Sequence, residues 1–425
     1  MERQYKDSKI EWIGQIPMDW EITKLGSLYT QRYEKVSDKD YPPLSVTMQG
    51  ILPQLETAAK TEDGDNRKLV CKGDFAINSR SDRRGSCGIS PYDGSVSLIN
   101  TILKPRGEMN PFFYNWLFHT SLFADEFYKW GHGIVDDLWT TRWQEMKNIS
   151  VVTPSLEEQQ RIADYLNKKC AEIEELIELQ EQMIAQLTDY KQSVITEAVT
   201  KGINPKAQFV PSDIDWIGDI PKGWTICRIK NISSLFGRIG FRGYTSEDLN
   251  KDGEGAITLS PSNMKPMGMD YSNVTYLSWW KYHESPEIKI QNGDLLMVKT
   301  GSSYGKVAYV DELPREATIN PQILRIVSHI NSKYLGYYLQ TPLFLYQVEC
   351  GVVGGTIPTI AQEKIYNFMV ILPLKDEQQL IVSYLDKKCS EIENLIAAKQ
   401  QKIEMLKDYK KSLIFECVTG KKEIK

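Results

Sequence analysis

The sequence has no long apolar run, no paired cysteines and no histidine cluster, and each absence excludes a class of protein. No stretch approaches the 18 or so apolar residues of a membrane-spanning helix, and the opening residues lack the apolar region of a signal peptide, so we expect a cytoplasmic protein without membrane contact. The seven cysteines form no Cys-x-x-Cys pair, which argues against a disulfide framework and a zinc ribbon. The four histidines are scattered without metal-ligand spacing.

Complete catalytic motifs are also missing. Phe236-Gly-Arg-Ile-Gly240 has the wrong spacing for the F-x-G-x-G pocket that binds S-adenosylmethionine, and Asn110-Pro-Phe-Phe113 lacks the second proline of an N-P-P-F site. Residues 301–306 fall one residue short of a phosphate-binding loop. We therefore expect that this chain is not an enzyme.

Two long stretches contain neither proline nor glycine, and they are copies of one another. The segment that follows Pro154 aligns with the one that follows Pro373 at a constant offset of 219, and both include the motif E-Q-Q. Their composition, rich in Glu, Lys, Gln, Leu and Ile, predicts one long helix in each. Ser155, with Glu158 three residues later, indicates a capping box at the start of the first helix.

Both predicted helices carry an apolar heptad seam. Its members are Leu166, Cys170, Ile173, Ile177, Ile184 and Leu187 in the first helix, and Leu385, Cys389, Ile392, Ile396, Ile403 and Leu406 in the second. Residues 157–201 carry ten acidic and five basic side chains, and residues 375–425 carry nine acidic and eleven basic ones. This charge difference favours an antiparallel coiled coil between the two helices. The alternatives are that each helix packs on its own domain, or that the pair drives homodimerisation.

A second repeat precedes each domain. The pattern W-I-G-x-I-P-x-x-W occurs at residues 12–20 and again at residues 216–224. The protein is therefore a tandem of two units, and its four repeated tryptophans, Trp12, Trp20, Trp216 and Trp224, are expected to be core anchors. We predict a first domain at residues 1–153, a helix at 154–202, a linker at 203–211, a second domain at 212–372 and a helix at 373–425.

Inside the domains the two sequence repeats share only a few positions. Short β-type runs are expected at residues 45–48, 75–77, 97–99, 256–259 and 295–298, with helical patterns at 110–129 and 332–349, which indicates a mixed α/β fold. The shared positions are Gly73 and Gly293, Gly85 and Gly305, Asn100 and Asn320, and Gly131 and Gly351. The loops between them differ. The net charge of −5 falls mostly on the first helix, so it does not exclude DNA as a partner.

The divergent loops supply the side chains that base readout requires. Arginine pairs with guanine and asparagine or glutamine with adenine, while lysine and hydroxyl groups contact phosphates. The candidates are Asn78, Arg80, Ser81, Arg83, Arg84 and Gln49 in the first unit, and Arg238, Arg242, Tyr244, Thr245, Lys299, Ser302, Ser303, Tyr304 and Lys306 in the second. The alternative for the first set is a solvated loop, and for the second it is stabilised turns.

Four motifs recur twice and in the same order: W-I-G-x-I-P-x-x-W, P-x-x-x-E-Q-Q, L-x-x-Y-K and V-T. Over essentially the whole chain, this pattern resembles the DNA specificity subunit of type I restriction–modification systems. The resemblance implies two target recognition domains, each reading half of a bipartite, asymmetric sequence in double-stranded DNA, and helices that act as spacers and dock the modification subunits, of which two are expected. It also implies restriction subunits as partners, and S-adenosylmethionine, ATP and Mg²⁺ bound by partner subunits rather than by this chain. An enzyme acting alone and a homodimeric scaffold remain as alternatives.

Overall fold

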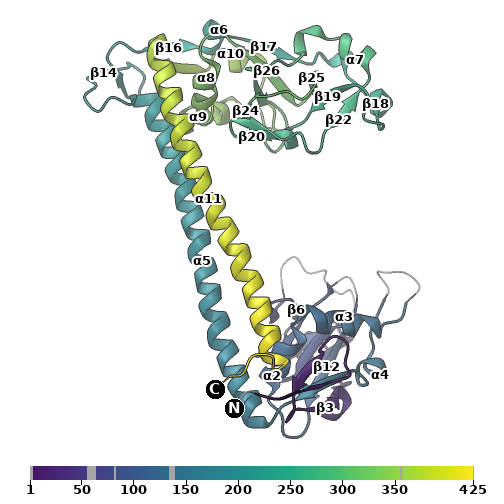
Figure 1. The fold of residues 1–425 in the computed structure, drawn as a ribbon. Coiled ribbons are helices and arrows are strands. Elements are labelled where there is room, and N and C mark those ends of the chain that lie inside the picture. Colours follow the sequence, from purple (N-terminus) through teal and green to yellow (C-terminus); the bar gives the residue numbers. More distant parts are fainter. Residues whose placement is uncertain (1–2, 55–63, 81–82, 134–138, 355–356, 425) are drawn as a thin grey trace. The chain divides into compact units, whose positions relative to one another are not determined.

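The computed structural model describes residues 3–54, 64–80, 83–133, 139–354 and 357–424 (Figure 1). The chain forms two compact units: unit 1 contains residues 1–181 and 399–425, and unit 2 contains residues 182–398. These units differ from the sequence repeats because each long helix contributes one half to each unit. The domain boundaries predicted from the sequence stay a prediction.

The two predicted long helices are present as α5 (Leu156–Lys201) and α11 (Lys375–Val418), and they pack together as predicted (Figure 1). In unit 1 the first half of α5 packs against the last half of α11, where Cys170 and Cys417 lie in one core. In unit 2 the last turns of α5 share a core with the first half of α11, including Cys389. The pairing is therefore antiparallel within each unit.

Polar pairs cross between the helices at fixed positions. They are Lys410 with Glu174 and Lys399 with Gln180 in unit 1, and Lys191 with Glu393 in unit 2. Lys191 and Lys410 occupy equivalent heptad positions, and each pairs with a glutamate of the other helix, so these pairs specify the antiparallel register. Of the predicted seam residues, Leu166, Cys170, Ile173, Leu385, Cys389, Ile392 and Ile403 are buried, and Ile177, Ile184, Leu187, Ile396 and Leu406 are half-buried.

Both domains are built around the same antiparallel four-stranded sheet, which together with the helices confirms the mixed α/β fold. In unit 1 the order is β10 (Cys87–Ile89), β9 (Phe75–Asn78), β12 (Asn100–Pro105) and β4 (Tyr29–Arg32). In unit 2 it is β24 (Val307–Tyr309), β23 (Leu295–Val298), β26 (Ile323–Ser328) and β17 (Ser233–Gly237). The shared sheet order places equivalent loops at equivalent edges of the two domains.

Smaller sheets complete each domain. Unit 1 adds a sheet of β11 (Gly94–Val96), β8 (Arg67–Val70) and β5 (Lys35–Val36) and the hairpin β6 (Leu44–Thr47) with β7 (Gly50–Pro53). Unit 2 adds β18 (Leu249–Asn250), β22 (Thr275–Leu277), β19 (Ala256–Leu259) and β25 (Ala317–Ile319) and the hairpin β20 (Met264–Lys265) with β21 (Gly268–Met269). Strand pairs close each domain beside its long helix: β3 (Glu21–Lys24) with β13 (Ser150–Thr153), and β16 (Thr225–Arg228) with β27 (Met369–Leu372).

The predicted helical patterns after each sheet are two helices rather than one. They are α2 (Pro111–Phe118) and α3 (Ser121–Lys129) in unit 1, and α8 (Ser332–Tyr338) and α9 (Pro342–Gly351) in unit 2. Thr120 and Thr341 separate them, because each hydroxyl accepts a backbone N–H of the second helix and so caps it. The expected strand at residues 97–99 is wrong, since that segment forms a turn between β11 and β12.

The repeated motifs hold each long helix on its domain. The indole N–H of Trp20 donates to the carboxylate of Glu158 at 2.9 Å, and that of Trp224 donates to Glu377 at 2.8 Å. In unit 1, Arg3 also contacts Glu158 at 2.7 Å. The Ser155 hydroxyl accepts the backbone N–H of Glu158 at 3.3 Å, as expected for a capping box, but the Glu158 carboxylate binds Trp20 and Arg3. We call the contacts of Glu158 and of Glu377 with their tryptophans the latches. Trp12, Trp20 and Trp224 are buried as predicted; Trp216 is half-buried.

The two glutamines of each E-Q-Q motif bind one capping asparagine. In unit 1 the amide oxygens of Gln159 and Gln160 accept from the backbone and side-chain N–H groups of Asn110, at 2.9 and 2.7 Å. Gln378 and Gln379 make the same two bonds to Asn331 in unit 2, at 3.2 and 2.9 Å. Asn110 and Asn331 cap α2 and α8, so the motif fixes the first helix of each domain on its long helix.

Candidate nucleic-acid interface

Each unit carries two loops that are joined by a β-bridge at the end of the central sheet. Loop one comprises residues 79–86 in unit 1 and residues 299–306 in unit 2, and it connects β9 to β10 or β23 to β24. Loop two comprises residues 131–141 and residues 351–360, and it precedes α4 (Trp143–Met146) or α10 (Gln362–Tyr366). Parts of these loops lie outside the described residues, and Ser81 is among them.

The bridges between the two loops are equivalent in the two units. Arg80 pairs with Thr140 in unit 1, and Thr300 pairs with Thr359 in unit 2. A backbone hydrogen bond follows in each: the Thr141 N–H donates to loop one at 3.0 Å, and the Ile360 N–H does so at 2.9 Å. The same backbone frame therefore carries different side chains, and we call these segments the paired loops.

Glycines set the shape of loop one, and an ion pair fixes the start of the strand that leads to it. Gly85 and Gly305 have φ values of +75° and +82°, a left-handed conformation that a side chain would strain. Before each loop a Gly-Asp turn begins the strand, and its aspartate holds an arginine of the sheet, Asp74 with Arg32 and Asp294 with Arg325, both at 2.7 Å. The glycines and aspartates are structural, which accounts for their recurrence in the sequence, whereas the two arginines come from non-equivalent strands, β4 and β26.

The predicted residues of loop one in unit 1 divide into supporting and exposed groups. Asn78 is buried, and its side chain accepts the Arg80 N–H at 3.0 Å, so it shapes the turn. Arg83 and Arg84 are exposed. The Arg84 guanidinium lies 3.2 Å from Asp125 and 5.0 Å from the Tyr128 ring. Because both partners of this ion pair are more than half exposed, it is weak and can be exchanged for a contact with an anion.

The predicted residues of loop one in unit 2 present hydroxyl groups and amines. Ser302 is exposed and Ser303 is half-buried. The Tyr304 hydroxyl donates to Glu349 at 3.1 Å, and this hydrogen bond raises the pKa of Tyr304. Burial lowers the pKa of Lys299, and Lys306 donates to the Pro261 carbonyl, in the turn between β19 and β20, at 3.2 Å.

The remaining candidates lie outside the paired loops. Arg238 is buried: its guanidinium donates to a backbone carbonyl and a threonine hydroxyl of β25 at 3.1 Å, stacks near Tyr244, and has its pKa lowered by burial. Arg242 pairs with a glutamate at 3.5 Å, and Thr245 caps a short turn. Gln49 lies at the tip of the β6–β7 hairpin and lines a cavity to which no described residue of the paired loops belongs. Their assignment to DNA binding stays a prediction.

Sequence reasoning missed loop two. In unit 1 its described residues expose His132, whereas in unit 2 Val353 and Ile357 are 57% and 63% exposed. The recurring Gly131 and Gly351 at its start were the available signal. A side chain at Gly131 would meet Trp139 at 2.3 Å, so the glycine is required by close packing.

The described residues contain no group of three or more His, Cys, Asp or Glu side chains placed to hold a metal ion. Within the same residues, no helix has the length and apolar character needed to cross a membrane. The paired loops offer arginine, lysine, hydroxyl and apolar groups on a bridged backbone frame, a chemistry suited to contacting bases and phosphates.

Comparison with known proteins agrees with this arrangement. The family model "Type I restriction modification DNA specificity domain" matches residues 17–188 and 221–405. The specificity subunit of the type I restriction enzyme MjaVIII of Methanocaldococcus jannaschii is 23% identical over 96% of this chain and 94% of its own length. The MjaX specificity subunit of the same organism is 23% identical over 97% and 96%.

Solved structures share the fold. One solved structure, described as the structural basis of complex assembly and conformational transition of the type I R-M system, contains a chain with a TM-score of 0.72 at 16% identity. The match covers 95% of this chain and 98% of that one. The HsdS subunit from Thermoanaerobacter tengcongensis has a TM-score of 0.52 at 17% identity, with the same coverage. The chain belongs to the type I restriction–modification DNA specificity family, and it is the non-catalytic DNA specificity subunit of such a system.

Proposed function

We propose that the chain reads a bipartite, asymmetric DNA sequence, one half-site with the paired loops of each unit. The observation that carries this proposal is the contrast between the bridges, which are equivalent in the two units, and the side chains around them, which are not. A frame that is kept while its exposed groups change is what two readers of different half-sites require. The latch residues and the Gly-Asp turns support the frame and do not read bases.

The exposed side chains suggest what each unit reads. In unit 1, Arg83 and Arg84 provide forked donors, which match the O6 and N7 acceptors of guanine. In unit 2, Val353 and Ile357 provide apolar contacts, which match the methyl group of thymine, and Ser302 provides a hydroxyl for a base or a phosphate. We therefore infer that guanine contributes to the first half-site and thymine to the second.

The chemistry belongs to partner subunits in this proposal. Two modification subunits, which bind S-adenosylmethionine, would methylate adenines in the site, and restriction subunits, which use ATP and Mg²⁺, would cut DNA that lacks the mark. The chain would act in the cytoplasm, where the DNA lies. Its own contribution is to hold the modification subunits on one sequence and to fix the distance between the half-sites.

Methylation mapping tests the proposal directly. Genomic DNA from cells with and without this gene would be sequenced by a method that detects methyladenine. Loss of methylation at one bipartite motif is the expected result, because the modification subunit would then lack its reader. Unchanged methylation at every motif contradicts the proposal. As a second assay, the purified chain with its modification subunit should shift a DNA fragment that carries the motif and leave a scrambled fragment unbound.

A further inference from the structure

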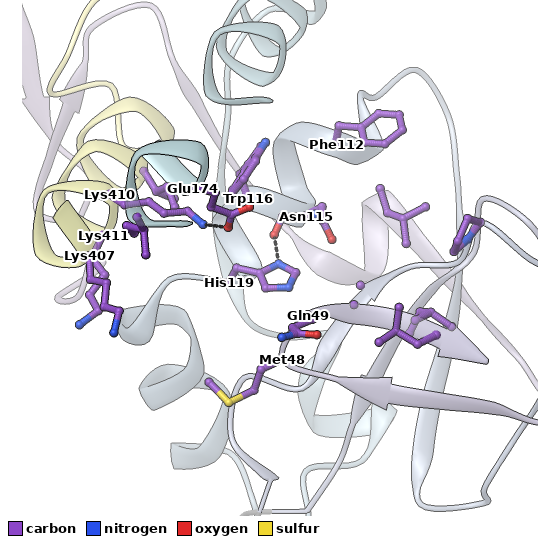
Figure 2. A pocket seen from close by; sticks show the side chains of 18 of the residues that line it. Met48, Gln49, Phe112, Asn115, Trp116, His119, Glu174, Lys407, Lys410 and Lys411 are labelled. Carbon is purple, nitrogen blue, oxygen red and sulfur yellow. Dashed lines mark hydrogen bonds and ion pairs between the residues drawn. The ribbon is translucent and has the colours of Figure 1, made fainter. Parts of the chain in front are cut away.

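Unit 1 contains a cavity of about 810 Å³ beside the helix pair (Figure 2). One wall is α2, with Phe112 and Trp116, and another is the tip of the β6–β7 hairpin, with Met48. The helix pair provides the third side, where Lys407 and Lys411 of α11 lie along the rim (Figure 2). This volume lies within the range of cavities that bind ligands.

An equivalent but smaller cavity, of about 310 Å³, occurs in unit 2. The capping asparagines align α2 with α8 at an offset of 221, so Phe112 corresponds to Lys333 and Trp116 to Tyr337. Each of these four residues lines the cavity of its own unit. The fold therefore creates a cavity at this place in both units, and the side chains decide what it can hold.

In unit 2 the side chains satisfy one another. The Lys333 amine lies 3.0 Å from one carboxylate oxygen of Asp386, and the Tyr337 hydroxyl donates to the other at 2.8 Å. Met267, at the tip of the β20–β21 hairpin, packs against the same region. The cavity of unit 2 is thus smaller and more polar, and its lining groups Lys333, Tyr337 and Asp386 bond to one another.

In unit 1 the same positions are apolar. Asn167 takes the place of Asp386 and accepts the Trp116 indole N–H at 2.9 Å, so the charged pair of unit 2 has no counterpart there. Phe112 is 53% exposed and Met48 is 71% exposed. Large apolar side chains that remain exposed around a cavity mark a site of interaction.

The rim of the unit 1 cavity is also more basic. At an offset of 219, Lys407 and Lys411 of α11 correspond to Thr188 and Gln192 of α5. Lys407 and Lys411 are each paired with an exposed acidic residue three positions earlier on α11, at 3.1 Å. Such exposed pairs contribute little and are readily exchanged for another carboxylate. The Lys410–Glu174 pair, in contrast, recurs in unit 2 as a contact between the helices, so it belongs to the fold.

We propose that the unit 1 cavity docks a short segment of a protein partner, in which a large apolar side chain is accompanied by carboxylates. The apolar side chain would lie between Phe112, Trp116 and Met48, and the carboxylates would meet Lys407 and Lys411. The phosphate backbone of DNA fits this site poorly, because it offers no apolar group to fill the cavity. In unit 2 the cavity is smaller and its lining groups Lys333, Tyr337 and Asp386 bond to one another, so we expect this mode of docking in unit 1 alone.

The partner in this inference is the modification subunit, and this choice rests on the proposed function. Crosslinking tests it in the assembled complex of the full chain with modification subunits and DNA. A photoreactive p-benzoylphenylalanine would replace Phe112 in one variant and the equivalent Lys333 in another. The expected result is a crosslink from position 112 to an apolar, acidic peptide of the modification subunit, and none from position 333. Crosslinks to DNA, to neither partner, or equally from both positions overturn the inference.

Charge reversal provides a second readout. The double variant Lys407→Glu with Lys411→Glu should weaken binding of the modification subunit by roughly tenfold or more, because like charges would meet at the rim. Lys402→Glu is the matched control, since Lys402 is exposed on the same helix but does not line the cavity. Equal affinities for the double variant and the control overturn the inference. Thermal unfolding would verify that both variants fold.

The two proposals can fail separately. If the motif is methylated only when the gene is present but the crosslink and the charge reversal have no effect, the docking site is wrong and the reader function stands. If methylation does not depend on the gene, the reader function fails, whatever binds the cavity.

Discussion

Units 1 and 2 share the strand order of the central sheet, the bridges between the paired loops and the Trp–Glu latches. They differ in the side chains of the loops beside the sheet. Trp20 with Glu158 and Trp224 with Glu377 make the same hydrogen bond, and the paired loops are bridged at the same positions. In contrast, the cationic side chains of loop one are arginines in unit 1 and lysines in unit 2, where neighbouring residues add hydroxyl groups. The difference shows that duplication preserved the means of holding a recognition surface, while the surface itself diverged.

The largest expected effect comes from breaking what the units share, the helix pair. Insertion of two residues after Leu179 and two next to Lys399, which pairs with the adjoining Gln180, should abolish assembly, because the apolar seam would turn away from its partner. Insertion of seven residues at both places keeps the seam in register and adds roughly 10 Å at 1.5 Å per residue. The gap between half-sites should then lengthen by up to about three base pairs at about 3.4 Å each.

The control for this prediction is internal. Methylation mapping of the seven-residue variant should return both original half-sites with a longer gap. An unchanged gap, or altered half-site bases, would show that the helices do not set the spacing.

The next largest effect compares the two latches. Glu158→Ala should destabilise unit 1 by about 3 kcal/mol, because it leaves a buried indole N–H and an arginine without their acceptor. Glu377→Ala should cost unit 2 about 1–2 kcal/mol, since that carboxylate is only half-buried and bonds to Trp224. Denaturant unfolding of the full chain would measure both. Equal losses in the two variants would mean that Arg3 adds nothing to the first latch.

Substitutions in the paired loops sharpen the comparison further. Arg84→Ala should relax recognition in one half-site by about 1–3 kcal/mol of discrimination at one base pair, the range for a bidentate contact, and Ile357→Ala should relax recognition in the other half-site. The methylation motif would be determined for both variants, with the seven-residue insertion variant as a control for general damage. A uniform loss of affinity across all sequences would instead assign Arg84 to a phosphate contact.

The smallest effect concerns pH and distinguishes the units at one position. His119 of unit 1 corresponds to Gln340 of unit 2. Burial lowers the pKa of His119 and outweighs the hydrogen bonds to Asn115 and Cys87, which raise it; Lys410 adds a smaller lowering contribution. The unfolded chain therefore takes up a proton first as the pH falls below about 6.5, and unit 1 loses stability in that window. His119→Gln should remove this part of the pH dependence, measured by melting temperature between pH 7.5 and 5.5. An unchanged profile would refute the assignment.

The sequence predicted the parts of the fold that depend on local pattern. The seam around Cys170 and Cys389 repeats every seven residues, and such a period can be recognised without a structure. Residues 97–99 were predicted as a strand because their apolar character resembles one, but the chain needs a turn there to bring β12 beside β9. The break at Thr120 was missed because a threonine cap is a weak signal inside an apolar helical pattern.

The candidate site was predicted less well, for a different reason. Arg83 and Arg84 could be proposed because charge is visible in a sequence, and their role stays a prediction. Loop two was not proposed, since its place beside loop one depends on a bridge between residues 60 positions apart, Arg80 and Thr140. Arg238 has the right chemistry, yet its burial depends on β25, some 80 positions away. Side-chain type can be predicted from a sequence, but exposure requires the fold.

The division of the long helices between the units has a consequence for synthesis of the protein on the ribosome. Unit 2 is one continuous stretch, residues 182–398, so it can close as soon as that stretch has emerged. The core of unit 1 includes Leu413 and Val418, which are translated after all of unit 2. At 5–20 residues per second, about 10–40 s separate the two parts of unit 1. The first half of α5 can pack on residues 1–153 during that interval, but the apolar residues that it shares with Leu413 and Val418 of α11 stay uncovered. Unit 1 is therefore begun first and completed last.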